Sequence, residues 1–173
     1  MENKIKNDLR MDKRLRAVFG EIDLGSVTSS PADTREGILA EQESEEAKQI
    51  KAITTMVSNS PHFKELVPET GLVTTTKEFI SQPDGNRIKI QYIRPDTDEE
   101  LPCVYYIHGG GMMIYSCFDE MYAAWGRCIA RQGVAVAMVD FRNAMWESSA
   151  PEIEPFPAGL DRKSTRLNSS HRC

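Results

Sequence analysis

Within residues 1–60, two segments place apolar side chains at the spacing of a helix with one apolar face. The first segment follows the i, i+4, i+7, i+8 pattern at Met11, Leu15, Val18 and Phe19. The second segment covers residues 44–56; Ser44 can cap it, and two acidic residues occupy its first turn. We therefore expect two helices here, separated by a loop.

From residue 73 onwards the apolar pattern changes from that of helices to that of strands. Residues 73–80 are rich in β-branched side chains, and residues 83–86 form a Pro-Asp-Gly-Asn turn cluster. Residues 87–92 then alternate: Ile88, Ile90 and Tyr92 face one side, and Arg87, Lys89 and Gln91 face the other. Two such runs joined by a turn predict an antiparallel hairpin with one face in solvent.

Two later runs, residues 103–107 and 134–139, are apolar throughout, which is typical of strands covered on both faces in a parallel sheet. Between them, a helix is expected from about Asp119 until Gly133 stops it. Its apolar stripe consists of Met121, Trp125, Cys128 and Ile129. Strand, helix and strand in this order predict a right-handed βαβ crossover.

The composition is that of a globular chain, because 40% of the 173 residues are hydrophobic and 27% are charged. No apolar run approaches the roughly 20 residues of a membrane span, and the first residues lack a signal-peptide core, so we expect a cytoplasmic protein. The net charge of −5 argues against nucleic acid as a partner. The four cysteines have no metal-type spacing with histidine, so we expect reduced thiols and no metal.

Candidate chemistry lies in the turn after residues 103–107, which reads His108-Gly109-Gly110-Gly111. Consecutive glycines at the carboxyl end of a parallel strand leave backbone N–H groups accessible, because no Cβ keeps a ligand away. Such donors can bind a phosphate or stabilise a developing oxyanion. No Gly-Lys-Ser/Thr follows and no G-x-G-x-x-G is present, so the sequence favours an oxyanion over a phosphate.

This loop and its surroundings resemble the hormone-sensitive-lipase type of carboxylesterase or lipase, which are α/β-hydrolases. His-Gly-Gly-Gly after a buried strand is the oxyanion-loop motif of such enzymes. Asp140-Phe141-Arg142 and Phe156-Pro157-Ala158 match two further positions of the family pattern. The resemblance implies an α/β fold class: the N-terminal half of an α/β-hydrolase fold, truncated, with a mixed and mostly parallel sheet. Residues 1–60 would form a helical cap segment and residues 61–160 a partial core.

The resemblance further implies hydrolysis of carboxylic esters of small molecules, without a cofactor. The N–H groups of Gly109 and Gly110, with Gly111 as a third candidate, would hold the oxyanion. His108 would orient the loop through a hydrogen bond instead of acting as the catalytic base, which in this family comes near the end of the domain.

The other catalytic residues are not found in the sequence, and the remaining residues near the motif are expected to have structural roles. The 173 residues contain no G-x-S-x-G turn, so the nucleophile, the acid and the base are not found in this chain. Met112 and Met113 are expected to line the core or a pocket. Asp140 and Arg142 are expected to be structural partners near the end of a strand.

The last residues differ in character from the rest of the chain. Residues 162–173 carry four Lys or Arg, no acidic residue and one large apolar side chain, so they cannot bury a helix face. Residues 161–171 also resemble a translated sequencing adaptor. We therefore expect residues 161–173 to be foreign and native sequence to end near Leu160, with a genuine basic tail as the alternative. Expressed as printed, the chain should expose an apolar sheet edge and aggregate.

Two other functions stay open. The chain could be an inactive truncated fragment that acts, if at all, as a binding module. An amidase or peptidase on the same scaffold is the nearer rival. Hydrolysis of p-nitrophenyl acetate and labelling of a serine by a fluorophosphonate probe separate the enzyme from the binding module.

Overall fold

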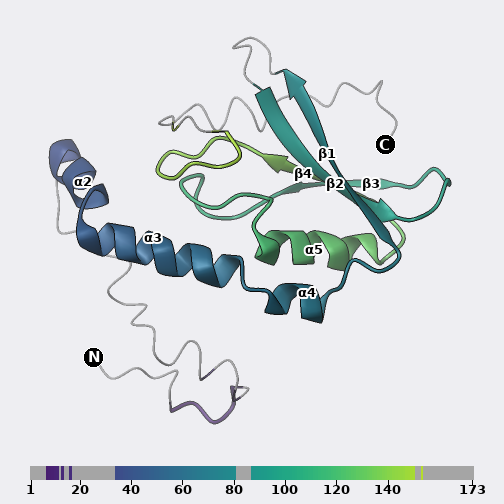
Figure 1. Ribbon diagram of the computed structural model, residues 1–173, viewed down its shortest axis with the longest axis horizontal. Coiled ribbons are helices and arrows are strands. Elements are labelled where there is room, and N and C mark those ends of the chain that lie inside the picture. The colour runs from purple at the N-terminus through teal and green to yellow at the C-terminus, as the bar shows by residue number, and fades with distance from the viewer. Residues whose placement is uncertain are drawn as a thin grey trace. The chain divides into compact units, whose positions relative to one another are not determined.

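A computed structural model describes residues 7–11, 13, 16, 34–80, 87–150 and 153 (Figure 1). The expected helix over residues 11–19 lies largely outside these residues. The turn at 83–86, the Phe-Pro-Ala step and the tail after Leu160 lie wholly outside them. The chain divides into two compact units, Met1–Lys48 and Gln49–Cys173. The expected boundary between cap and core at residue 60 stays a prediction.

In the first unit, two helices begin at capped N-termini. Helix α2, Arg35–Gln42, was not expected from the sequence; the Thr34 side chain accepts a hydrogen bond from the Gly37 amide at 3.1 Å. Helix α3, Glu45–Ser58, starts in this unit. The Ser44 hydroxyl accepts from the Ala47 amide at 3.1 Å, as the sequence predicts.

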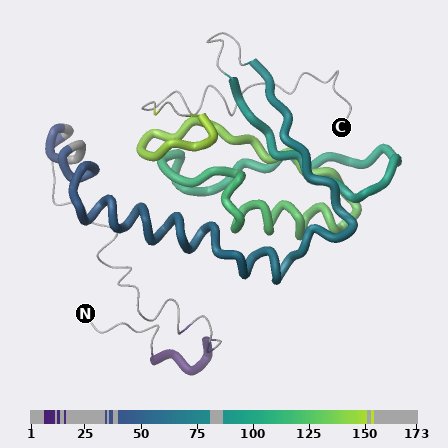
Figure 2. The backbone as a smooth tube through the Cα atoms, in the orientation of Figure 1, coloured from purple at the N-terminus to yellow at the C-terminus, as the bar shows by residue number. Residues whose placement is uncertain are grey.

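The second unit contains a four-stranded sheet with two helices, α4 (His62–Leu66) and α5 (Glu120–Ala130). The strands are β1 Leu72–Ile80, β2 Arg87–Pro95, β3 Cys103–Ile107 and β4 Ala135–Asp140. Their order is β1-β2-β4-β3. Strand β2 is antiparallel to both β1 and β4, whereas β3 and β4 are parallel and joined through α5. The backbone trace runs from α4 directly into the long β1–β2 hairpin (Figure 2). The predicted hairpin, βαβ unit and mixed sheet are confirmed. The sheet is not mostly parallel over the described strands, because two of its three pairings are antiparallel.

The two apolar strands differ in burial, contrary to the sequence analysis. All six residues of β4 are buried, as predicted. In β3, however, Val104 is 37% exposed and Ile107 is 39% exposed. The reason is position: β4 pairs on both sides, whereas β3 pairs only with β4 among the described strands and therefore forms an edge.

The expected solvent face of the hairpin is also only partly correct. Gln91, expected to face solvent, is 8% exposed, and Ile93 is fully buried. The cause is that β2 lies inside the sheet and pairs with β4 from Lys89 to Ile93. Strand β1 carries the exposed surface instead.

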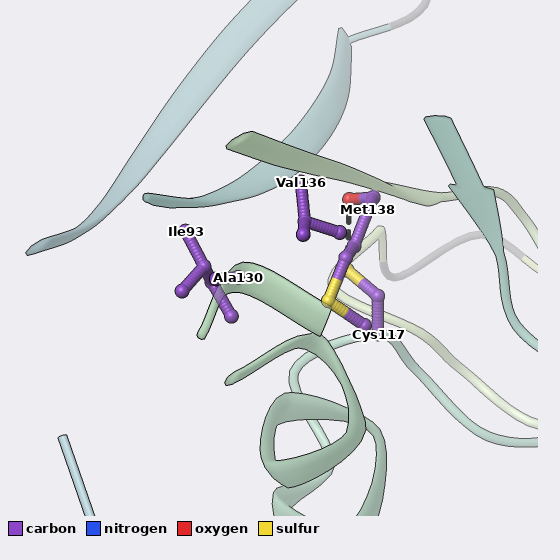
Figure 3. Packing of buried hydrophobic residues seen from close by; sticks show 5 residues of the cluster. All are labelled: Ile93, Cys117, Ala130, Val136 and Met138. Carbon is purple, nitrogen blue, oxygen red and sulfur yellow. Dashed lines mark hydrogen bonds between the residues drawn. The ribbon is translucent and has the colours of Figure 1, made fainter. Parts of the chain in front are cut away.

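Helix α5 packs on the sheet mainly through small residues, and the apolar stripe that the sequence suggested is only partly correct, because Ile129 packs partly buried against the core. Its buried residues are Ala123, Ala124, Gly126, Arg127 and Ala130, whereas Trp125 of the expected stripe is 53% exposed. A Cβ on Gly126 would lie 2.4 Å from the Met138 sulfur and 2.9 Å from Ile93 Cδ1. The helix therefore approaches the sheet more closely than a stripe of large side chains would permit. Figure 3 shows the core beneath it, with Ile93, Cys117, Ala130, Val136 and Met138.

Arg127 is buried on the same helix, although the sequence analysis placed it only in the last turn. Its Nε donates to the Val67 carbonyl at 2.6 Å, and its guanidinium also pairs with the Glu120 carboxylate. These bonds compensate a charge that would be costly to bury alone, and the bond to Val67 connects α5 to the segment between α4 and β1.

None of the helices among the described residues has the length and apolar character of a membrane-spanning segment.

The open edge of β3 yields a prediction about self-association. Exposed apolar edge strands template pairing with other chains, and charged residues on the edge oppose it. The chain as printed should form oligomers in size-exclusion chromatography with light scattering. Replacing Val104 and Ile107 together by Lys should weaken this association on the order of tenfold. A Met56→Lys variant is the control, because Met56 is an exposed apolar residue on helix α3 and not on an edge strand. Monomeric behaviour of the unmodified chain would contradict the prediction.

The buried thiol of Cys117 yields a prediction about reactivity. Burial, followed by the nearby Asp140 carboxylate, raises the pKa of this thiol, whose Sγ donates to the Met138 carbonyl at 3.2 Å. Since the thiolate is the reactive form, Cys117 should react with iodoacetamide at least about 100-fold more slowly than Cys103 and Cys128 between pH 7 and 9. Mass spectrometry of the alkylated peptides measures each rate, and denaturant should remove the difference. Equal rates in the native chain would show that this packing is wrong.

Candidate active site

The glycine loop follows β3 at the carboxyl end of the two parallel strands. Gly110 and Gly111 have φ of 114° and 65°, the region that favours glycine. At Gly110 a side chain is also excluded by space, because a Cβ would lie 2.3 Å from the Ile114 carbonyl oxygen. That approach closes a tight turn in which the Gly110 carbonyl accepts from the amides of Met113 (3.0 Å) and Ile114 (3.2 Å). The backbone conformation of the loop therefore requires glycine at position 110.

The three glycine amides differ in their surroundings. The Gly109 N–H faces the phenolic oxygen of Tyr122, and a Cβ on Gly109 would lie 3.1 Å from that oxygen. No acceptor among the described residues takes a hydrogen bond from the Gly110 or Gly111 amide. Two neighbouring donors therefore remain available where the loop turns.

His108 is 3% exposed and lies under the loop. Its Nδ1 is 2.8 Å from the Gly109 carbonyl oxygen, and since a carbonyl only accepts, Nδ1 carries the proton. The ring stacks on Phe141 with centroids 4.2 Å apart and planes 7° from parallel. The histidine is thus fixed between the loop and the end of β4.

Asp140, the last residue of β4, is 2% exposed and uses both carboxylate oxygens. Oδ1 accepts from the Ser116 hydroxyl at 2.7 Å and from the Cys117 amide at 2.9 Å. Oδ2 accepts from the Ser149 amide at 2.7 Å. His108 Nε2 lies 3.9 Å from Oδ1. The structural role expected for Asp140 agrees with these contacts, and Arg142 nearby is also buried.

A serine, an acid and a histidine therefore lie together, but not in the order of a catalytic triad. In a triad the histidine takes the proton of the serine hydroxyl, and the acid orients the histidine. Here the Ser116 hydroxyl donates to the Asp140 carboxylate. Ser116 is consequently held as a structural donor and is not activated as a nucleophile.

The loop continues along the segment that follows β4. The amides of Ala144, Met145 and Trp146 donate to the carbonyls of Met112 and Met113 at 3.0 to 3.1 Å. Met112 packs against the cluster of Ile88, Val139 and Phe141, whereas Met113 is 44% exposed. The sequence analysis missed this pairing and the role of Ser116, because no local motif links positions so far apart in the sequence.

Three tyrosines surround the loop: Tyr106, Tyr115 and Tyr122. Tyr122 lies between the others, with ring centroids 6.5 Å from Tyr106 and 5.8 Å from Tyr115. Burial is the main cause that raises the pKa of each phenol, so all three are neutral near pH 7. They supply an aromatic wall and hydroxyl groups but no base.

Two other features bear on ligands. An apolar groove of about 470 Å³ lies between α4 and α5, lined by residues that include Phe63, Met121 and Trp125. It shares Tyr106 and Tyr122 with the surroundings of the glycine loop. Among the residues that the structure describes, no group of three or more His, Cys, Asp or Glu side chains could hold a metal ion.

Comparison with known proteins finds esterases. No protein-family model matches the sequence. The solved structure of esterase Est22 is 48% identical with a TM-score of 0.82, over 93% of this chain and 46% of that chain. The hyperthermophilic esterase from the archaeon Pyrobaculum calidifontis shares the fold, at 23% identity and a TM-score of 0.57, over 87% and 40% of the two chains. Gut esterase 1 of Caenorhabditis elegans is 35% identical over 65 residues, 38% of this chain and 12% of that protein.

The chain thus spans less than half the length of these relatives. Within that share, the mixed sheet and its helices match the partial α/β-hydrolase fold that the sequence predicted. Over the part of the fold that it spans, this chain is similar in sequence and structure to esterases with an α/β-hydrolase fold.

Proposed function

We propose that this chain supplies the oxyanion loop of a serine esterase that acts on carboxylic esters of small molecules. The observation that carries the proposal is the pair of unused amides at Gly110 and Gly111, in a left-handed turn after a parallel strand. Preorganised N–H donors of this kind stabilise the negative charge that develops when an ester carbonyl is attacked.

The arrangement of the loop supports Gly110 and Gly111 as the principal donors. The sequence alone favoured Gly109 and Gly110, but the Gly109 amide faces the Tyr122 phenolic oxygen. In the proposed role, His108 orients the loop through its bond to the Gly109 carbonyl, as the sequence suggested. The Met113 side chain, exposed beside the loop, would contact the substrate.

In the proposed reaction, a serine attacks the ester carbonyl while a histidine, oriented by an acid, takes its proton. The oxygen of the tetrahedral intermediate would point at the glycine amides, and the alcohol would leave as the histidine returns the proton. Water, deprotonated by the same histidine, would then attack the acyl-serine, and the carboxylic acid would leave as the serine recovers its proton. The nucleophile and its partners would come from the part of the fold that relatives have and this chain does not match. The negative net charge and absence of long apolar runs support a cytoplasmic enzyme that does not bind nucleic acid.

A hybrid protein tests the activity, with residues 34–150 replacing the part of esterase Est22 that they match. One solved structure of Est22 contains p-nitrophenol, the alcohol released from p-nitrophenyl esters. We expect the hybrid to hydrolyse p-nitrophenyl acetate and to be labelled by a fluorophosphonate probe, whereas the 173-residue chain should do neither.

Two results of the hybrid experiment would oppose the proposal. A folded hybrid that neither hydrolyses the ester nor reacts with the probe would favour a binding module. A hybrid that cleaves p-nitroacetanilide faster than p-nitrophenyl acetate would favour the amidase alternative. Circular dichroism and thermal unfolding establish that the hybrid is folded.

Replacing Gly110 by Ala in the hybrid tests the loop itself. The new Cβ would collide with the Ile114 carbonyl oxygen, so the loop must shift, and its N–H groups would no longer point at the oxyanion. We expect kcat to fall about 100-fold or more, the usual cost of losing an oxyanion donor, with little change in KM.

Gly71→Ala is the matched control for the Gly110 variant. Gly71 also has a positive φ, of 75°, but it lies before β1 and no atom stands within 4 Å of its added Cβ. It should therefore cost stability from backbone strain without lowering kcat. An unchanged kcat in the Gly110 variant would remove this loop from the mechanism.

A further inference from the structure

We propose that Asp140 is a positioning residue that holds the glycine loop in its active shape. The proposal rests on the proposed function, because it concerns the same loop. Asp140 itself does not face the Gly110 and Gly111 amides. It acts through Ser116 and Cys117, which its carboxylate binds directly.

The carboxylate is built into the fold at a fixed place. Strand β4 pairs with β2 up to the Lys89–Asp140 register, and with β3 up to Ile107–Val139. The glycine loop leaves β3 one residue after that last pair. The carboxylate therefore stands on a strand that is bonded on both sides, next to the point where the loop begins.

Three hydrogen bonds compensate the burial of the charge. Donors to a buried carboxylate form strong bonds, and removing one leaves a costly vacancy. Ser116 and Cys117 hold the returning limb of the glycine loop, and Ser149 holds the segment that follows β4. One side chain thus joins two loops that also meet through backbone hydrogen bonds and aromatic contacts. The Asn143 side chain adds a bond between them by donating to the Tyr115 carbonyl at 2.6 Å.

The connection reaches the glycines by two routes. In the chain, Ser116 follows the turn closed by the Gly110 carbonyl with Met113 and Ile114. Across space, Asp140 Oδ1 lies 3.9 Å from His108 Nε2, and His108 Nδ1 binds the Gly109 carbonyl. The carboxylate is therefore hydrogen-bonded to the Ser116 end of the loop and lies close to, but is not hydrogen-bonded to, its His108 end.

Hydrogen exchange in the 173-residue chain tests the positioning without any need for activity. The reporters are the Met113 and Ile114 amides, which bind the Gly110 carbonyl and do not touch Asp140. In Asp140→Asn and in Ser116→Ala, exchange at both amides should be about tenfold faster or more, while α5 amides change less than about twofold. Ser148→Ala is the matched control, since the Ser148 hydroxyl accepts from the Ala150 amide and makes no bond to the glycine loop among the described residues. It should change neither group.

The outcomes separate the two hypotheses. Unchanged exchange rates at Met113 and Ile114 in both variants would overturn the positioning role. An equal increase of the exchange rates in the loop and in α5 would also overturn it, because it would indicate that the whole fold is destabilised.

The same two variants in the Est22 hybrid should lower kcat about tenfold or more with KM nearly constant, and Ser148→Ala should not. Faster loop exchange together with an inactive unsubstituted hybrid would support the role of Asp140 and reject the esterase function instead.

Discussion

The arrangement depends on β4, a strand that is hydrogen-bonded along both edges and buried on both faces. Its antiparallel pairing with β2 and its parallel pairing with β3 set the register of the sheet. Because β3 pairs with β4 alone among the described strands, the position of the start of the glycine loop follows from that pairing. A carboxylate at the end of β4 is then held where it can bind the loop as it returns. The loop is irregular, yet it begins beside a strand that is hydrogen-bonded on both edges and is bonded to that strand's last residue.

The buried carboxylate of Asp140 is the group through which β4 positions the glycine loop. An apolar side chain at position 140 would pack without any preferred partner, whereas a buried carboxylate demands donors in defined directions. The fold meets the demand with one hydroxyl and two amides from separate loops. Because the buried carboxylate needs these hydrogen bonds, it fixes the positions of two loops that have no regular structure of their own.

The parts of the fold that the sequence predicted are those determined by local pattern. The hairpin of β1 and β2, the apolar run of β4, the cap at Ser44 and the strand–helix–strand order each follow from neighbouring residues, and the structure agrees. The failures concern relations between distant segments. The exposed edge of β3 and the burial of Gln91 depend on strand order, which no local pattern encodes. Against the sheet, helix α5 buries alanine and glycine and leaves Trp125 exposed, because the helix lies too close to the sheet for large side chains at those positions. In the candidate site, the glycines were evident from their motif, but Ser116 acquires its role only from Asp140, which is 24 residues away.

The contact between Gly126 and Met138 has a consequence for how this sequence can diverge. The helix and strand are so close that position 126 has no room for a methyl group, whereas Met138 fills its space with a flexible chain that smaller residues can replace. The two positions therefore differ in how freely they can be substituted during evolution. A side chain can enter at 126 only after volume has been lost at 138 or at Ile93, so substitutions in this pair of elements should covary in a fixed order, strand first and helix second.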